Sequence, residues 1–302
     1  MFTGKTNTPE FGQSATTENC LGEDARNPWD ISRTPGGSSG GASASVAAGL
    51  ASVAIGADGG GSIRIPAAFT GLFGIKPTHG LCSNENGFSA MSDFIVPGPL
   101  SRCVEDARIV LEVLAECKYA RQSLKGQRLR IAWCPKPGNN PVANEVSKLV
   151  GEAMEKMATL GHEIKETKLP LEGWNQAFDT LVLAEENRER GFLLEKTPER
   201  LSDYERKSLE AAKKLTVQDE EKSRTAHIEY KQRFRKFFTN FDVIATPTTA
   251  TTAFPLGKRP EVIEGQQVSW LWGAFPFTSP FNVSGNPAVS LPCGLCEDLP
   301  VG

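Results

Sequence analysis

Two glycine-rich turns that carry serine flank a short run of small and apolar residues, and this arrangement constrains the chain more than any other feature. The first turn is residues 35–41 (PGGSSGG) and the second is residues 59–64 (GGGSIR). Between them, residues 42–55 (ASASVAAGLASVAI) are expected to form a buried helix that runs into a strand. An apolar pattern resumes directly after the second turn, at Ile63, Ile65 and Phe69. Both turns are therefore expected to be enclosed between packed elements, unlike a flexible Gly-Ser linker.

The residues in these turns suit the cleavage of an amide. That reaction needs a nucleophile, a group that takes its proton, and donors for the oxygen that becomes negative in the tetrahedral intermediate. Gly59, Gly60 and Gly61 leave the backbone before Ser62 free to turn sharply, so that successive N–H groups can converge on one anion. The pattern predicts an acyl-transfer site that uses the serines at 62 and 38.

The same residues carry a family resemblance. Residues 34–41 (TPGGSSGG), 57–67 (ADGGGSIRIPA) and 71–77 (GLFGIKP) resemble the signature of the amidase signature family. Further blocks are similar to the family's and occur in the same order: 4–12 (GKTNTPEFG), 27–30 (NPWD), 98–102 (GPLSR), 241–248 (FDVIATPT) and 280–294 (PFNVSGNPAVSLPCG). The resemblance covers residues 1–115 and 241–302 well and the middle of the chain poorly.

This resemblance implies a Ser-Ser-Lys mechanism that cleaves a carboxylic amide to an acid and an amine or ammonia through a seryl acyl-enzyme, without a cofactor. Ser62 matches the nucleophile. Ser38 matches the bridging serine, which in such enzymes adjoins a non-prolyl cis peptide bond. The backbone of Gly59, Gly60, Gly61 and Ser62 matches the oxyanion hole. Asp58 and Arg64 are expected to tie the second turn to its surroundings and to take no part in the chemistry.

The chain departs from the family pattern at its ends. The catalytic lysine of the family lies upstream of the block at 4–12, and Lys5 belongs to that different block. The chain also stops before the family's final segment. We therefore expect an internal portion of a longer protein, with weak or no activity as it stands, because a lysine of lowered pKa activates the serine pair. A non-catalytic pseudoenzyme or inactive fragment stays open as an alternative.

Other enzyme classes fit less well. The A-type subunit of the amidotransferases shares the signature but usually has glutamine where this chain has Ile65, so a stand-alone amidase is favoured. Residues 36–40 (GGSSG) satisfy the G-x-S-x-G pattern of α/β-hydrolases, yet the prolines before them do not suit the strand which that elbow needs. Of the available bases His79, His162 and His227, the last two are expected at the surface. Residues 4–6 (GKT) resemble the end of a P-loop, but Pro9 prevents the helix that should follow.

Composition agrees with a soluble enzyme. The net charge of -3 argues against nucleic acid as the main partner. No apolar run is long enough for a membrane span and no signal peptide is present, which favours the cytoplasm. A small-molecule amide substrate is expected, and a homo-oligomer stays open. The seven cysteines are scattered, as expected for free thiols, and the C-x-x-C pair at Cys293 and Cys296 is expected to be a buried thiol site. No metal is expected.

The predicted fold class is α/β, with a mixed β-sheet core layered by α-helices, as a single amidase domain (1–302) that is incomplete at both ends. Residues 1–118 form the signature core, 119–240 a mostly helical substrate-side region, and 241–302 return to the core. The periodicity predicts a helix over 102–116 capped by Ser101, a helix over 142–160, strands over 129–134, 162–168 and 288–291, and charged helices over 174–238. Aromatic residues between 270 and 281 can line an acyl pocket or pack in the core.

Overall fold

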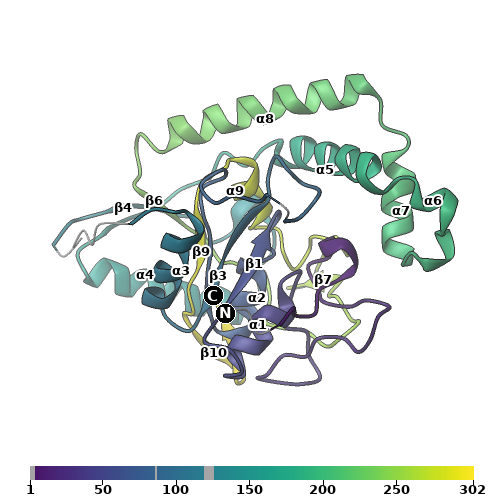
Figure 1. Ribbon diagram of the computed structural model, residues 1–302. Coiled ribbons are helices and arrows are strands. Elements are labelled where there is room, and N and C mark those ends of the chain that lie inside the picture. Colours follow the sequence, from purple (N-terminus) through teal and green to yellow (C-terminus); the bar gives the residue numbers. More distant parts are fainter. Residues whose placement is uncertain (1–3, 86, 119–125) are drawn as a thin grey trace.

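The computed structural model describes residues 4–85, 87–118 and 126–302, and at its centre lies a four-stranded antiparallel sheet (Figure 1). Its strands are β1 (Val53–Asp58), β2 (Phe73–Lys76), β3 (Val96–Ser101) and β9 (Ala288–Ser290), in the order β1-β3-β2-β9. β1 pairs with β3 along its whole length, and β2 pairs with β9. Residues far apart in the sequence therefore build the sheet that carries the second glycine turn.

Three helices pack against this sheet: α1 (Gly40–Ala47), α2 (Arg64–Thr70) and α3 (Val104–Leu114). Every residue of α2 is buried, and the helix ends at Gly71, whose φ of 71° is the left-handed conformation that favours glycine. The apolar side chains between α1, α2 and the sheet form a common cluster, which consists of Ala42, Val46, Ile63, Ala67, Leu72 and Leu100. The predicted sequence of buried helix, strand, turn and core is thus confirmed.

A second sheet is separate from the first and is parallel. β4 (Arg130–Trp133) is at its centre between β5 (Glu163–Glu166) and β6 (Val243–Ala245), and α4 (Asn144–Thr159) makes the crossover from β4 to β5. A parallel pair needs such a crossover, and here a helix supplies it. Two hairpins complete the strands: β7 (Val262–Ile263) with β8 (Gln266–Gln267), and β10 (Gly294–Cys296) with β11 (Leu299–Val301). The expected mixed α/β class is confirmed, with parallel and antiparallel strands in separate sheets.

The middle of the chain is helical, as predicted, and covers one side of the molecule (Figure 1). It contains α5 (Trp174–Arg190), α6 (Leu193–Lys196), α7 (Asp203–Ala212) and α8 (Val217–Phe237), and α9 (Ser279–Val283) packs against α5 and α8. α8 begins with a capping box between Thr216 and Asp219. Among the residues described, no helix is long and apolar enough to cross a membrane.

Three local predictions are wrong. Ser101 does not cap α3; it ends β3, its hydroxyl donates to the Cys103 carbonyl, and the helix begins at Val104. His227 is buried and not at the surface, because α8 turns this face toward α9, where the imidazole Nε2 lies 2.9 Å from the Val283 carbonyl oxygen. Burial lowers its pKa. Cys293 and Cys296 are half-buried, since the short β10–β11 hairpin leaves them partly open to solvent.

Tyr230 on α8 carries a buried hydroxyl whose effect on stability can be tested. Its ring is fully buried and packs on Phe234 with centroids 5.0 Å apart, but its hydroxyl has no hydrogen-bond partner among the described residues. Because an unpaired buried hydroxyl costs free energy, we expect Tyr230→Phe to leave the free energy of unfolding unchanged or to raise it by up to about 1–2 kcal/mol. Urea denaturation measures this, with Phe234→Ala, expected to lose about 3–5 kcal/mol, as the control. A loss above about 1 kcal/mol in Tyr230→Phe would contradict the expectation.

Glu205 on α7 makes stability depend on pH. Its side chain is 1% exposed and both carboxylate oxygens lack a hydrogen-bond partner among the described residues. Burial, together with the nearby Glu186 and Glu10, raises its pKa to about 8, and Arg190 opposes this shift. The folded state therefore binds a proton more tightly than the unfolded state does, so stability falls as pH rises from about 4.5 to about 8.

We expect Glu205→Gln to remove the loss of stability that ionisation of Glu205 causes as the pH rises. Relative to the wild type, the variant should gain stability progressively between these two pH values and keep the gain above them, in thermal melts recorded from about pH 4 to about pH 9. Glu210→Gln, on the exposed face of the same helix, is the matched control. A constant difference between wild type and Glu205→Gln across the whole range would show that the carboxyl does not titrate in this interval.

Candidate active site

The fold brings the two serine turns into contact. The backbone N–H of Ser39 donates to the carbonyl of Ser62, with 3.1 Å between nitrogen and oxygen. Ser38 follows a cis peptide bond from Gly37, as the family resemblance led us to expect. Ser38 is buried, with 9% of its surface exposed, and Ser62 is half-buried in the turn between β1 and α2. The two serines singled out from the sequence thus lie on adjoining segments.

The N-terminal segment holds the first turn in place. A Cβ atom on Gly37 would lie 2.6 Å from the carbonyl oxygen of Thr16, so this position has room only for glycine. The hydroxyl of Thr17 donates to the carbonyl of Gly36, and that of Thr8 to the carbonyl of Ser38. Sequence reasoning did not identify these threonines, because nothing in the local pattern shows that residues 8–17 return to the serine turn.

A buried ion pair holds the second turn. The carboxylate of Asp58 accepts two hydrogen bonds from the Arg64 guanidinium, from Nε and Nη2, each 2.9 Å long. Asn282 on α9 completes the arrangement: its amide donates to Asp58, and its oxygen accepts from Arg64 Nη2. Both charged side chains are nearly inaccessible, at 0% and 3% exposure. This supports the expectation that Asp58 and Arg64 tie the turn to its surroundings.

The pair also sets the charge of its neighbourhood. Burial alone would raise the pKa of Asp58, but Arg64 and the Asn282 amide lower it to about 2, so the carboxylate stays ionised. Lys76, at the end of β2, is fully buried, and its ammonium donates to the Pro77 carbonyl. Burial and the Arg64 charge lower its pKa to about 7, while Asp58 opposes the shift. Lys76 is a titratable group that the sequence pattern did not mark.

Two hydroxyls from the C-terminal part fix the peptide plane in the glycine turn. Thr278 and Ser279 both donate to the carbonyl of Gly60, at 2.7 and 2.8 Å. The following residue, Gly61, has a φ of 132°, and a Cβ atom there would clash with the Thr278 hydroxyl oxygen. The conformation and the close approach both require glycine. The neighbouring N–H groups are thereby held in fixed directions.

Some N–H groups of the turn are hydrogen-bonded within the protein and others are not. The N–H of Gly61 donates to Asp58 Oδ1 at 2.8 Å and is therefore occupied. Within the described part of the chain, the N–H groups of Gly59, Gly60 and Ser62 have no acceptor, and the hydroxyls of Ser38 and Ser62 make no hydrogen bond. The turn thus offers both a hydroxyl and unengaged backbone donors in one place.

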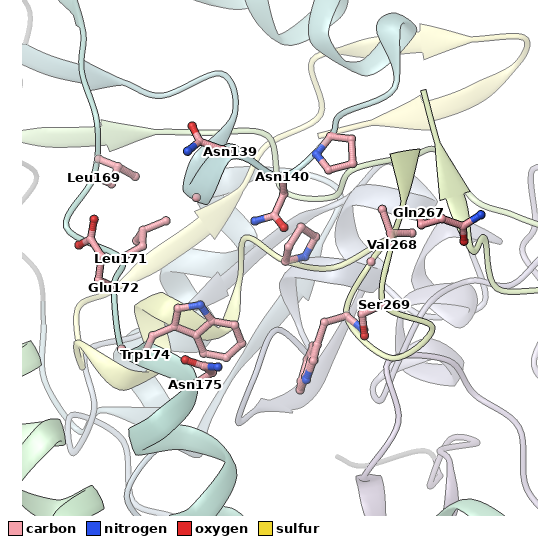
Figure 2. A pocket seen from close by; sticks show the side chains of 16 residues that line it. Asn139, Asn140, Leu169, Leu171, Glu172, Trp174, Asn175, Gln267, Val268 and Ser269 are labelled. Carbon is pink, nitrogen blue, oxygen red and sulfur yellow. The ribbon is translucent and has the colours of Figure 1, made fainter. Parts of the chain in front are cut away.

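A cavity of about 540 Å³ is lined by residues of the middle and the C-terminal part of the chain (Figure 2). Trp174 and Trp272 line it, and both rings pack against Phe178, whose ring edge would meet a Cβ atom on Gly60 at 3.1 Å. The lining is mixed: Figure 2 labels the polar side chains of Asn139, Asn140, Glu172, Asn175, Gln267 and Ser269 together with the apolar Leu169, Leu171 and Val268. Phe275 and Phe277, from the same aromatic-rich stretch, are instead buried in the core.

A metal ion is held by several histidine, cysteine or carboxylate side chains that converge on one point. Among residues 4–85, 87–118 and 126–302, no group of three or more histidine, cysteine, aspartate or glutamate side chains could bind one. The histidines lie apart from the serine turns: His79 Nε2 contacts the Ser92 carbonyl, and His162 Nδ1 accepts from the N–H of Leu129. The imidazole bases of a Ser-His site are therefore not assembled in the described part of the chain.

The Asp58–Arg64 ion pair is expected to contribute measurably to the stability of the fold. We expect Asp58→Asn to cost about 3–5 kcal/mol in the free energy of unfolding, because it leaves the Arg64 charge buried without a partner. Guanidinium denaturation at neutral pH measures this loss. Asp242→Asn, which removes the carboxylate from the exposed Arg130–Asp242 pair, is the matched control and should cost far less. Equal losses of unfolding free energy in the two variants would show that the buried Asp58–Arg64 pair matters no more for stability than the exposed pair does.

Comparison with known proteins agrees with this geometry. The sequence profile of the family described as Amidase matches residues 1–302. The chain is 31% identical over 347 aligned residues to the A-type subunit of a glutamyl-tRNA(Gln) amidotransferase from Clostridium botulinum, covering all of this chain and 69% of that protein. It is 33% identical to an acylamidase of Rhodococcus erythropolis, covering all of this chain and 67% of that enzyme.

Solved structures show the same relationship. A crystal structure of an amidase superposes with a TM-score of 0.92 at 32% identity, covering 98% of this chain and 68% of the other. A bacterial aryl acylamidase of the amidase signature enzymes superposes with a TM-score of 0.85 at 27% identity, covering 99% and 67%. The chain thus spans about two thirds of the length of these relatives. It belongs to the amidase family and is an enzyme of the amidase type, which acts on amide C–N bonds.

Proposed function

We propose that this chain hydrolyses a carboxylic amide through an acyl-enzyme on Ser62. The observation that carries the proposal is the direct contact between the two serine turns, made by the hydrogen bond from Ser39 to Ser62. In this mechanism the Ser62 hydroxyl oxygen attacks the amide carbonyl carbon, the C–N bond breaks to release the amine, and water then cleaves the seryl ester to give the acid. No cofactor takes part.

Ser38 is proposed to carry the proton. It accepts the proton of Ser62 as the bond to carbon forms, and it supplies a proton to the nitrogen as the amine leaves. The family resemblance places a lysine behind this serine, and residues 1–302 contain no counterpart of it. Lys76 does not fill that role, since its ammonium is engaged with Pro77 beside the Asp58–Arg64 pair. Ser38 and Ser62 are therefore the part of the relay that this chain supplies.

The glycine turn is proposed to hold the oxyanion. Gly59, Gly60 and Gly61 form its backbone, and the unengaged N–H groups of Gly59, Gly60 and Ser62 are the available donors within the described residues. The Gly61 N–H contributes indirectly, because its bond to Asp58 fixes the turn. Donors held in advance stabilise the developing charge without reorganisation, which is usually the largest single contribution to this kind of catalysis.

A subunit of an amidotransferase is the second candidate. Its support is the similarity to the A-type amidotransferase subunit of Clostridium botulinum. Against it stands Ile65, where such subunits usually have glutamine: here the side chain is 1% exposed and packs in an apolar cluster with Phe69. Copurification of the chain from its native source with two further amidotransferase subunits would decide for this candidate, and a chain that hydrolyses amides alone would decide for the amidase.

Covalent labelling tests the proposed nucleophile. A fluorophosphonate should label the wild type at Ser62, as read by peptide mass spectrometry, and should not label Ser62→Ala. We expect Ser38→Ala to slow labelling by about 100- to 10,000-fold, because proton transfer from the nucleophile is lost. Ser45→Ala is the matched control, since its hydroxyl bonds within α1 and it should label at the wild-type rate.

The opposite result has a clear meaning. A protein that is folded by circular dichroism but shows no label at Ser62 would overturn the proposal and favour a non-catalytic role for the chain. Equal labelling rates in Ser38→Ala and Ser45→Ala would leave Ser62 as the nucleophile but remove Ser38 from the relay.

A further inference from the structure

Arg259 is hydrogen-bonded to the N-terminal segment that packs against the first serine turn. It lies in the loop between β6 and β7, and its Nη2 donates to the hydroxyls of Ser14 and Thr16, the latter at 2.7 Å. Its Nη1 lies 3.5 Å from the carbonyl oxygen of Leu271. A guanidinium has five N–H donors, so these three contacts leave two without an acceptor among the described residues.

The charge of Arg259 has no direct partner either. In the described part of the chain, no carboxylate oxygen lies within the 4.0 Å of an ion pair from its guanidinium. Burial lowers its pKa, while Glu18 and Tyr204 oppose the shift, and Glu18 contacts Arg259 only indirectly, through the Thr16 hydroxyl. Arginine nevertheless stays protonated in proteins, so a partly buried positive charge is left without a direct counter-charge.

Two contacts fix the position of this charge. Thr16, which accepts from Arg259, has its backbone against Gly37, the residue that precedes Ser38. On its other side the guanidinium stacks on Trp270, 4.6 Å from the ring centroid, and Trp270 is 51% exposed. The charge is therefore fixed to the segment behind Ser38, and its stacking partner borders solvent.

We infer that Arg259 binds a carboxylate carried by the amine part of the substrate, so that the preferred substrates are N-acylated amino acids. The inference rests on the proposed function, in which Ser38 delivers a proton to the departing nitrogen, so the amine part must extend toward Ser38. Arg259 is tied to that same side through Thr16 and Gly37. Both Nη2 hydrogens are used by Ser14 and Thr16, so the free Nε–H and the remaining Nη1–H each offer a single charge-assisted hydrogen bond to a carboxylate oxygen.

A matched substrate pair tests the inference. N-Butyrylglycine carries the carboxylate, and N-(2-methylpropyl)butanamide has the same shape without the charge; N-butyryl-4-aminobutyrate places the carboxylate farther from the amide. We expect the wild type to prefer at least one acid over the neutral amide. Arg259→Gln should lower kcat/KM for that acid by about 10- to 100-fold, mostly through KM, and change the neutral amide by less than about threefold. Arg259→Lys should recover part of the loss.

Controls separate this inference from the proposed function. Arg188→Gln, which removes an exposed cation paired with Glu220, should affect neither substrate. Calorimetric binding of the same three compounds to Ser62→Ala, with and without Arg259→Gln, reports recognition even where no turnover occurs. If a fluorophosphonate does not label Ser62 in the wild type but the carboxylate compounds still bind in a manner that depends on Arg259, the proposed function is rejected and the role of Arg259 stands. Equal losses for acid and neutral amide in Arg259→Gln, or no preference for either acid in turnover and binding, would overturn the role of Arg259.

Discussion

The architecture of the candidate active site depends on one buried ion pair. Asp58 ends a strand, Arg64 begins a helix, and the three glycines and Ser62 lie between them, so the Asp58–Arg64 pair closes the turn at its base. Two charges out of water are tolerated only when their hydrogen-bonding groups are satisfied, and here Asn282, the Thr278 carbonyl and the backbone N–H groups of the turn supply those bonds. The same carboxylate that neutralises Arg64 therefore also shapes the backbone around Ser62.

The polar groups of the turn fall into two sets, those that are hydrogen-bonded within the protein and those that are not. Asp58 occupies the N–H of Gly61, while the hydroxyls of Thr278 and Ser279 occupy the carbonyl of Gly60. The groups that remain unengaged within the described residues, at Gly59, Gly60 and Ser62, are the ones that a substrate oxygen could meet. The groups that are used internally fix the turn, and the unengaged groups are those to which the proposed function assigns contact with the substrate.

Much of this could be predicted from the sequence, since glycine and serine at fixed positions dictate local geometry. The helix and strand between the turns and the structural role of Asp58 and Arg64 follow from motifs contained in short segments, and the cis peptide bond before Ser38 was implied by the family resemblance. The partners that come from far along the chain could not be predicted: no local pattern marks Thr16, Arg259 or Thr278, and the family block at 280–294 does not show that its Asn282 contacts Asp58. The burial of His227 was missed for the same reason, because α9 covers it only in the folded chain.

The distance in sequence between the parts of the ion-pair cluster also bears on synthesis of the protein. Asp58 and Arg64 leave the ribosome well before Thr278, Ser279 and Asn282, which follow at separations of 214 to 224 residues from their partners in the turn. Until that later segment emerges, the charges have water as their partner and neither hydroxyl holds the Gly60 carbonyl. Contacts this remote close late in folding. The nascent chain thus carries Ser62, the proposed nucleophile, in an unorganised loop, and the turn around it is assembled only after residues 278–282 have been made.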